Sequence, residues 1–121
     1  MAMRKVHDFH PSIYPCRLWV YIGSENMEDE FSKVEQLEDD SIAETQATRY
    51  LPNGKRGVLV RFRSRKAMTA EIITHESVHA AAEILRSVGG QIDVDNQEPL
   101  AYLAGWVADC IDQVKKNKFK E

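Results

Sequence analysis

The segment that decides the fold of this chain is AMTAEIITHESVHAAAEILRSVGG, residues 67–90. Its apolar residues recur at helical spacing, which predicts a helix over about 67–88. Gly89 follows directly, at the position where glycine commonly terminates a helix. The segment contains the pattern H-E-x-x-H. His75 and His79 are four residues apart, so both project from one face of the predicted helix.

This spacing predicts a metal site. Two imidazoles at positions i and i+4 can bind one zinc ion, and the glutamate between them then lies beside the metal. In that arrangement Glu76 acts as general base and takes a proton from zinc-bound water. The alternative is a pair of solvated or packed histidines that fall four apart by chance. The helical context favours the metal site.

A catalytic zinc site normally has three protein ligands, so the two histidines leave one ligand to find. Glu98 is the strongest candidate, because it begins a second predicted helix, from about Asn96 to Lys116, that can fold back along the first. Glu98 also has a simpler interpretation, since an acidic residue in the first turn stabilises any helix. His7 and His10 lie in the N-terminal arm, and nothing in their spacing connects them to the site.

Small residues predict that the two helices approach each other closely, which metal bonds of about 2.0–2.2 Å require. They are Ala80, Ala81 and Ala82 on the first helix and Ala101, Ala104, Gly105 and Ala108 on the second. The second helix also carries an apolar stripe that predicts core packing, formed by Leu100, Leu103, Val107, Ile111 and Val114. Tyr102 and Trp106 lie on another side of it. If they are exposed, they indicate a partner surface or a homo-oligomer.

The first half of the chain predicts a small sheet. Residues 1–15 have the pattern of an irregular N-terminal arm, and Cys16–Ile22 reads as a strand rich in β-branched and aromatic residues. Thr45–Leu51 and Gly57–Phe62 flank an Asn-Gly turn, which predicts a β-hairpin.

A further helix is predicted between the first strand and the hairpin, over roughly Glu25–Leu37, followed by a polar loop at 38–44. Its inner face would be formed by Met27, Phe31, Val34 and Leu37. The predicted fold is α+β, with a small antiparallel or mixed three-stranded sheet packed against the two C-terminal helices. Residues 1–121 form a single domain in this prediction.

Composition limits the classes of function. The chain has 121 residues, a net charge of −3 and 43% hydrophobic residues, which gives no broad reason to expect a nucleic-acid partner. Arg61 and Arg63 alternate with apolar residues on one predicted strand, so a basic strand face remains an alternative nucleic-acid surface. No segment is long and apolar enough for a signal or a membrane span, which predicts a cytoplasmic protein. Cys16 and Cys110 are expected to be packed free thiols.

At the quoted motif the chain resembles the gluzincin class of zinc metallopeptidases, in which a glutamate ligand on a later helix follows H-E-x-x-H. The matching segments are THESVHA, residues 74–80, and NQEPLAYL, residues 96–103. The chain is also similar to compact H-E-x-x-H domains of phages and mobile elements, including the ImmA/IrrE-like proteases.

The resemblance implies a zincin-like fold with one Zn²⁺ per chain. It makes His75, His79 and Glu98 the zinc ligands and Glu76 the general base. The 45–62 hairpin would supply a sheet edge that pairs with an extended peptide.

The chain departs from the family pattern at one position. Thermolysin-like members have an aspartate four residues after the glutamate ligand, and this chain has Tyr102 there. Asp93, Asp95 or Asp109 could orient a ligand instead, and Tyr102 or Tyr50 could stabilise the transition state.

The expected function is therefore a zinc-dependent metallopeptidase that hydrolyses a peptide or protein substrate. The alternative is a metal-binding regulatory or interaction domain with little turnover.

Overall fold

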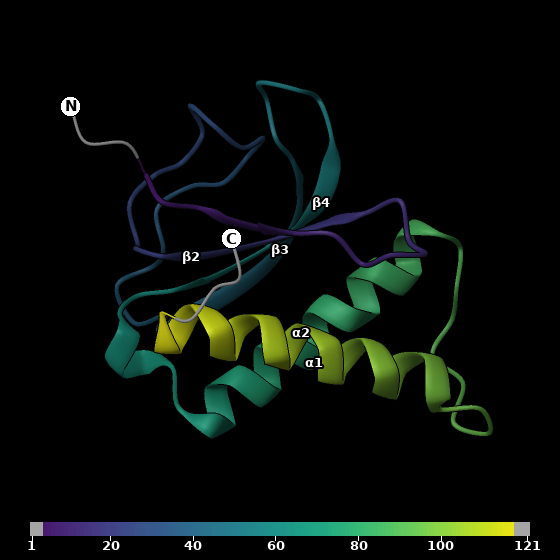
Figure 1. Ribbon diagram of the computed structural model, residues 1–121. Coiled ribbons are helices and arrows are strands. Elements are labelled where there is room, and N and C mark those ends of the chain that lie inside the picture. Colours follow the sequence, from purple (N-terminus) through teal and green to yellow (C-terminus); the bar gives the residue numbers. More distant parts are fainter. Residues whose placement is uncertain (1–3, 118–121) are drawn as a thin grey trace.

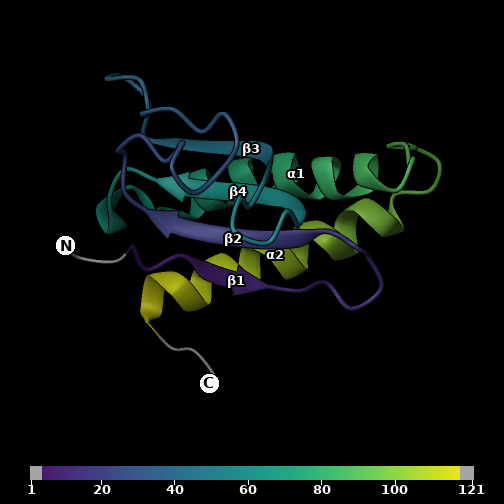
Figure 2. The same cartoon turned by 90° about the horizontal axis from the view of Figure 1, so that it is seen from above.

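Four strands form one mixed sheet, and two long helices cover one of its faces (Figures 1 and 2). The computed structural model describes residues 4–117. The strands are β1 (His7–Phe9), β2 (Arg17–Ile22), β3 (Ala43–Arg49) and β4 (Arg56–Phe62), and a 3-10 turn and the helices α1 (Ala70–Ser87) and α2 (Glu98–Lys116) follow. The predicted α+β class is confirmed, and of the two sheet types that the sequence left open, antiparallel or mixed, the sheet is mixed. The ends of the predicted domain, residues 1–3 and 118–121, lie outside the described residues.

The sheet has four strands in the order β1-β2-β4-β3, so the prediction of three strands was wrong. The additional strand is β1, inside the segment predicted to be irregular. It pairs antiparallel with β2, with His7 opposite Val20 and Phe9 opposite Leu18. Three residues are too few to show an alternating pattern, and β1 is defined by its pairing with β2 rather than by its own sequence.

The hairpin of β3 and β4 is confirmed, with the strands antiparallel from Ala43 opposite Phe62 to Arg49 opposite Arg56. At its turn Gly54 has a φ of 70°, a left-handed conformation that favours glycine. β2 and β4 run parallel at the centre of the sheet. Parallel strands need a crossover connection between them. Here the chain passes through residues 23–42, called the crossover below, and then through the strand β3.

The two faces of the sheet carry separate cores. Alternate residues of β2 and β4 face the helices and join a cluster with α1 and α2, which includes Leu18, Val20, Val58, Val60, Phe62, Ala80, Ile84, Val107 and Ile111. The other face packs under the crossover in a cluster of Trp19, Tyr21, Met27, Phe31, Val34 and Leu59.

The helix predicted over Glu25–Leu37 is absent, and this stretch forms turns. Its four predicted inner residues are nevertheless buried, each at most 3% exposed. Lys33 has a φ of 61°, which interrupts helical geometry. Side chains from elsewhere in the chain bond to the backbone carbonyls of this segment in place of helical amides.

Arg61 makes the deepest of these contacts. Its side chain is 1% exposed, and it donates to the carbonyls of Glu25 (2.8 Å) and Glu35 and to the carboxylate of Glu44 (2.9 Å). Arg63 similarly donates to the carbonyls of Ser41 (2.8 Å) and Glu38 (2.6 Å). Arg61 therefore does not contribute to a basic surface on this strand, because its guanidinium is buried and hydrogen-bonded inside the protein.

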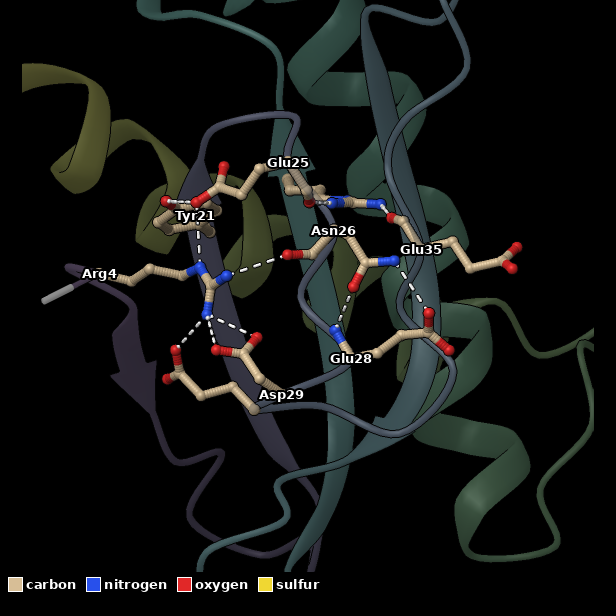
Figure 3. Close-up of polar contacts among 9 residues, drawn as sticks. Arg4, Tyr21, Glu25, Asn26, Glu28, Asp29 and Glu35 are labelled. Carbon is tan, nitrogen blue, oxygen red and sulfur yellow. Dashed lines mark hydrogen bonds and ion pairs between the residues drawn. The ribbon is translucent and has the colours of Figure 1, made fainter.

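Arg4 fastens the other side of the crossover (Figure 3). It bonds to Glu25 (3.0 Å), Asp29 (2.9 Å) and Glu30 (2.8 Å), and to the backbone carbonyl of Asn26 (2.9 Å). The Tyr21 hydroxyl donates to the same Glu25 carboxylate at 2.6 Å. Burial, reinforced by this carboxylate, raises the pKa of Tyr21 to about 12. The crossover is thus held by side chains from β2, β4 and the N-terminal segment.

The helices lie close to their predicted positions. The Thr69 hydroxyl accepts from the Ile72 amide (3.2 Å) and caps α1. The apolar stripe of α2 is buried at Leu103, Val107, Ile111 and Val114, as predicted, whereas Leu100 is partly buried. No helix within residues 4–117 is long and apolar enough to cross a membrane.

The predicted role of Gly105 in close helix packing was wrong. Gly105 is exposed, and a Cβ at this position would meet no atom within 4 Å. The small residues buried in the core are Ala80 and Ala81 on α1. Cys16 and Cys110 are buried free thiols, and burial raises the pKa of Cys110 to about 12.

We predict that Arg61→Met lowers the free energy of unfolding by about 3–5 kcal/mol, because it leaves the carboxylate of Glu44 and the crossover carbonyls without their buried partner. Urea unfolding followed by circular dichroism measures the change. Arg49→Met is the matched control, since Arg49 lies exposed on the neighbouring strand. Equal stability of the two variants would contradict the structural role of Arg61.

Candidate functional site

The H-E-x-x-H residues, 75–79, lie in the middle of α1 and face two directions. His75 and His79 are exposed, with ring centroids 4.8 Å apart and ring planes at 72°. Glu76 points toward the sheet and is 7% exposed. The helix thus presents two neighbouring imidazoles to solvent and one buried carboxylate beside them, as the four-residue spacing predicts.

Thr45 on β3 fixes the carboxylate of Glu76. Its hydroxyl donates to Glu76 Oε1 at 2.6 Å, while Oε2 lies 3.9 Å from Nε2 of His75. The sequence analysis did not identify Thr45 as a residue of the site. Thr45 lies opposite Val60, a residue of the core that faces the helices. Strand alternation in the predicted hairpin therefore places Thr45 on the face that α1 covers.

A hollow of about 460 Å³ opens beside Glu76 and His79. One wall is β3, from Ala43 to Gln46, and the other is the crossover between Lys33 and Ser41. The lining includes the carboxylate-bearing residues Glu35, Glu38 and Glu44. Of these, Glu44 is paired with Arg61.

β3 is one of the two outer strands of the sheet and packs against α1, as Figure 2 shows. The carbonyl of Ile42 accepts from the Arg63 amide (2.8 Å), and the amide of Tyr50 donates to Lys55 (2.8 Å). Even-numbered residues therefore bond to β4, and the backbone groups of the odd-numbered residues point outward. At Arg49 the outward carbonyl accepts from Ser32 (3.0 Å). The free part of this edge is thus the stretch 43–47, beside Glu76.

Glu98 lies elsewhere in the structure. It lines a second hollow, of about 570 Å³, between α2 and residues 11–14. Glu98 is the first residue of α2, whereas His79 lies within α1 and lines the hollow beside Glu76, and the two hollows share no lining residue. The structure does not bring Glu98 together with the two histidines.

The remaining predicted residues also lie away from Glu76. Tyr102 lines the second hollow with Glu98 and is 76% exposed. Asp109 is exposed and accepts from the side chain of Gln113 (3.1 Å). The alternatives Asp93 and Asp95 lie in the exposed turn before α2.

The side chains present fit a zinc ion in part. Two exposed imidazoles on one helical face supply two ligands of the expected type, and the carboxylate expected beside them is in place. Within the described part of the chain, no group of three or more His, Cys, Asp or Glu side chains is arranged to hold a metal ion. The site therefore has two candidate zinc ligands, and within residues 4–117 a third is not in place beside them.

Comparison with known proteins adds no family to these observations. No protein-family model matches the chain, and neither the curated proteins nor the solved structures include a significant match.

We predict that Thr45→Val lowers the free energy of unfolding by about 1–3 kcal/mol, because the buried Glu76 carboxylate loses its hydroxyl donor while the side-chain volume stays the same. Thr45→Ser is the matched control, since it keeps a hydroxyl at this position. Chemical denaturation of both variants measures the difference. If the valine variant is as stable as the wild type, the hydrogen bond does not hold Glu76.

Proposed function

We propose that this protein is a zinc-dependent peptidase in which His75 and His79 bind the metal and Glu76 is the general base. One observation carries the proposal: α1 presents the two imidazoles side by side next to a buried carboxylate that Thr45 holds in place. Helical spacing alone places the two imidazoles side by side, whereas the burial of Glu76 and its hydrogen bond to Thr45 do not follow from the motif.

A bound zinc ion would supply an activated water and polarise the substrate carbonyl. Glu76 would take the proton from the attacking water and deliver it to the leaving amine. With Oε1 occupied by the Thr45 hydroxyl, Oε2 is the oxygen on the side of His75. The side chain of Thr45 thereby positions the base.

The substrate is a peptide or protein segment in extended conformation. The outward backbone groups of 43–47 can pair with such a segment as an added strand. The hollow between β3 and the crossover would receive the side chains that point away from α1.

Glu98 is the third ligand that the resemblance implies. In this structure it lines the hollow at the start of α2, so ligation by Glu98 requires the first turn of α2 to approach His79. A carboxylate of the crossover, Glu35 or Glu38, is the alternative, because these residues line the same hollow as His79.

The second candidate function is a metal-binding regulatory or interaction domain without turnover. It is favoured by the incomplete ligand set among residues 4–117. We propose a cytoplasmic location for either function, because two free, buried cysteines are compatible with a reducing compartment.

We predict about one zinc per chain in the wild type, little in His75→Ala, and unchanged zinc but no peptide hydrolysis in Glu76→Gln. The glutamine variant keeps the size of the side chain and removes its basicity. Elemental analysis and cleavage of a mixed peptide library provide the two measurements. Zinc without cleavage in the wild type would support the regulatory domain, and normal cleavage by Glu76→Gln would refute the assigned base.

The resemblance predicts that Glu98→Ala lowers zinc affinity at least tenfold, as loss of one ligand of three should, while the fold is retained. Competition with a chromophoric chelator measures the affinity. The controls are Glu35→Ala and Glu38→Ala, each of which removes a carboxylate near His79 instead. If only a control variant loses affinity, the third ligand comes from the crossover.

A further inference from the structure

The hollow between α2 and the N-terminal segment is lined by aromatic side chains. Tyr14, Tyr102 and Trp106 all contribute to it, together with Ile13, and its volume of about 570 Å³ is in the range of ligand-binding cavities. Ile13 is 85% exposed and Tyr102 is 76% exposed. Two large side chains that line this hollow are thus exposed to solvent, as is typical of a surface that binds a partner.

A single carboxylate stands among these side chains. Glu98 lines the hollow, and no ion pair to Glu98 occurs within residues 4–117. Neither lysine nor arginine contributes to the lining. A carboxylate beside aromatic faces attracts a cation in two ways, through its charge and through the quadrupole of the rings.

The sequence around the hollow has the same sign of charge. From Ser87 to Val114 the chain contains no lysine or arginine and five acidic residues, Asp93, Asp95, Glu98, Asp109 and Asp112. Asp112 is paired with Lys116 (2.8 Å). The turn that contains Asp93 and Asp95 reaches the hollow at Asn96, through the bridge between Asp93 and Asn96. A peptide bound in this hollow would therefore contact aromatic side chains and be surrounded by acidic residues.

We propose that this hollow binds a basic peptide segment and seats an arginine or lysine side chain between Glu98 and the rings of Tyr102 and Trp106. The charge pattern selects this occupant, because an acidic or purely apolar segment would leave Glu98 without a counter-charge. This site is separate from the hollow beside His79, and it does not depend on peptidase activity.

The test uses a fluorescein-labelled nonapeptide in which arginine alternates with leucine, and a second peptide with citrulline in place of arginine. Citrulline keeps the shape of the side chain and removes its charge. Binding to the full chain is followed by fluorescence anisotropy in a buffer with chelator, so that Glu98 is available whatever its role toward a metal.

The wild type should bind the arginine peptide about five- to tenfold more tightly than the citrulline peptide. Glu98→Gln should remove most of this preference, and Tyr102→Leu should weaken binding of the arginine peptide several-fold. Glu71→Gln is the matched control, because Glu71 is likewise an exposed glutamate in the first turn of a helix. It should bind like the wild type.

Intrinsic fluorescence locates the bound peptide. The chain has two tryptophans, and Trp19 is buried under the crossover on the opposite face of the sheet. Unlabelled arginine peptide should therefore change the emission of Trp106 in a Trp19→Phe variant. Equal binding of the two peptides would overturn the proposal. So would binding that survives Glu98→Gln but falls in Glu38→Gln, which would place the peptide beside His79.

Discussion

The buried guanidinium of Arg61 is the constraint on which the candidate site depends. A charge in this position is tolerable only because several acceptors surround it, and they come from two different segments. The carboxylate belongs to Glu44 on the edge strand, and the carbonyls belong to Glu25 and Glu35 in the crossover. Arg61 therefore joins the central strand β4 to a segment without regular secondary structure. That segment becomes a fixed wall, and the wall lines the hollow beside Glu76 and His79.

The strand β3 connects this network to the motif through its alternation. Glu44 points to the crossover face and reaches Arg61, whereas the next residue, Thr45, points to the helix face and reaches Glu76. A shift of the β3–β4 register by one residue would exchange these two faces and break both contacts. The same register directs the backbone groups of Thr45 outward, next to the carboxylate that its side chain holds. The position of the base and the free sheet edge are thus consequences of one pairing.

The sequence predicts the features that depend on local periodicity. Both long helices, the hairpin and the buried residues of the crossover follow from spacing, and so does the common face of His75 and His79. The helix at Glu25–Leu37 was predicted wrongly because its apolar residues have helical spacing while its carbonyls are bonded by arginines far away in the chain. The role of Thr45 was not predicted for a related reason, since its partner Glu76 is 31 residues away in the chain. Glu98 shows the same limit, because the turn before α2 sets its position relative to the histidines.

The burial of α2 explains why Glu98 is separate from the motif. At 100° per residue, Glu98, Tyr102, Gly105 and Asp109 lie on one face of the helix, and the buried stripe that contains Leu103 and Val107 lies on the opposite face. Rotating α2 to direct Glu98 toward α1 would expose that stripe, at a cost of about 1.5–3 kcal/mol for each large apolar side chain. Unwinding only the first turn leaves the stripe in place and has no side-chain cap to break at Gln97. Any movement of Glu98 toward His79 would therefore begin with unwinding of the first turn of α2. The same movement would take the Glu98 carboxylate out of the aromatic hollow.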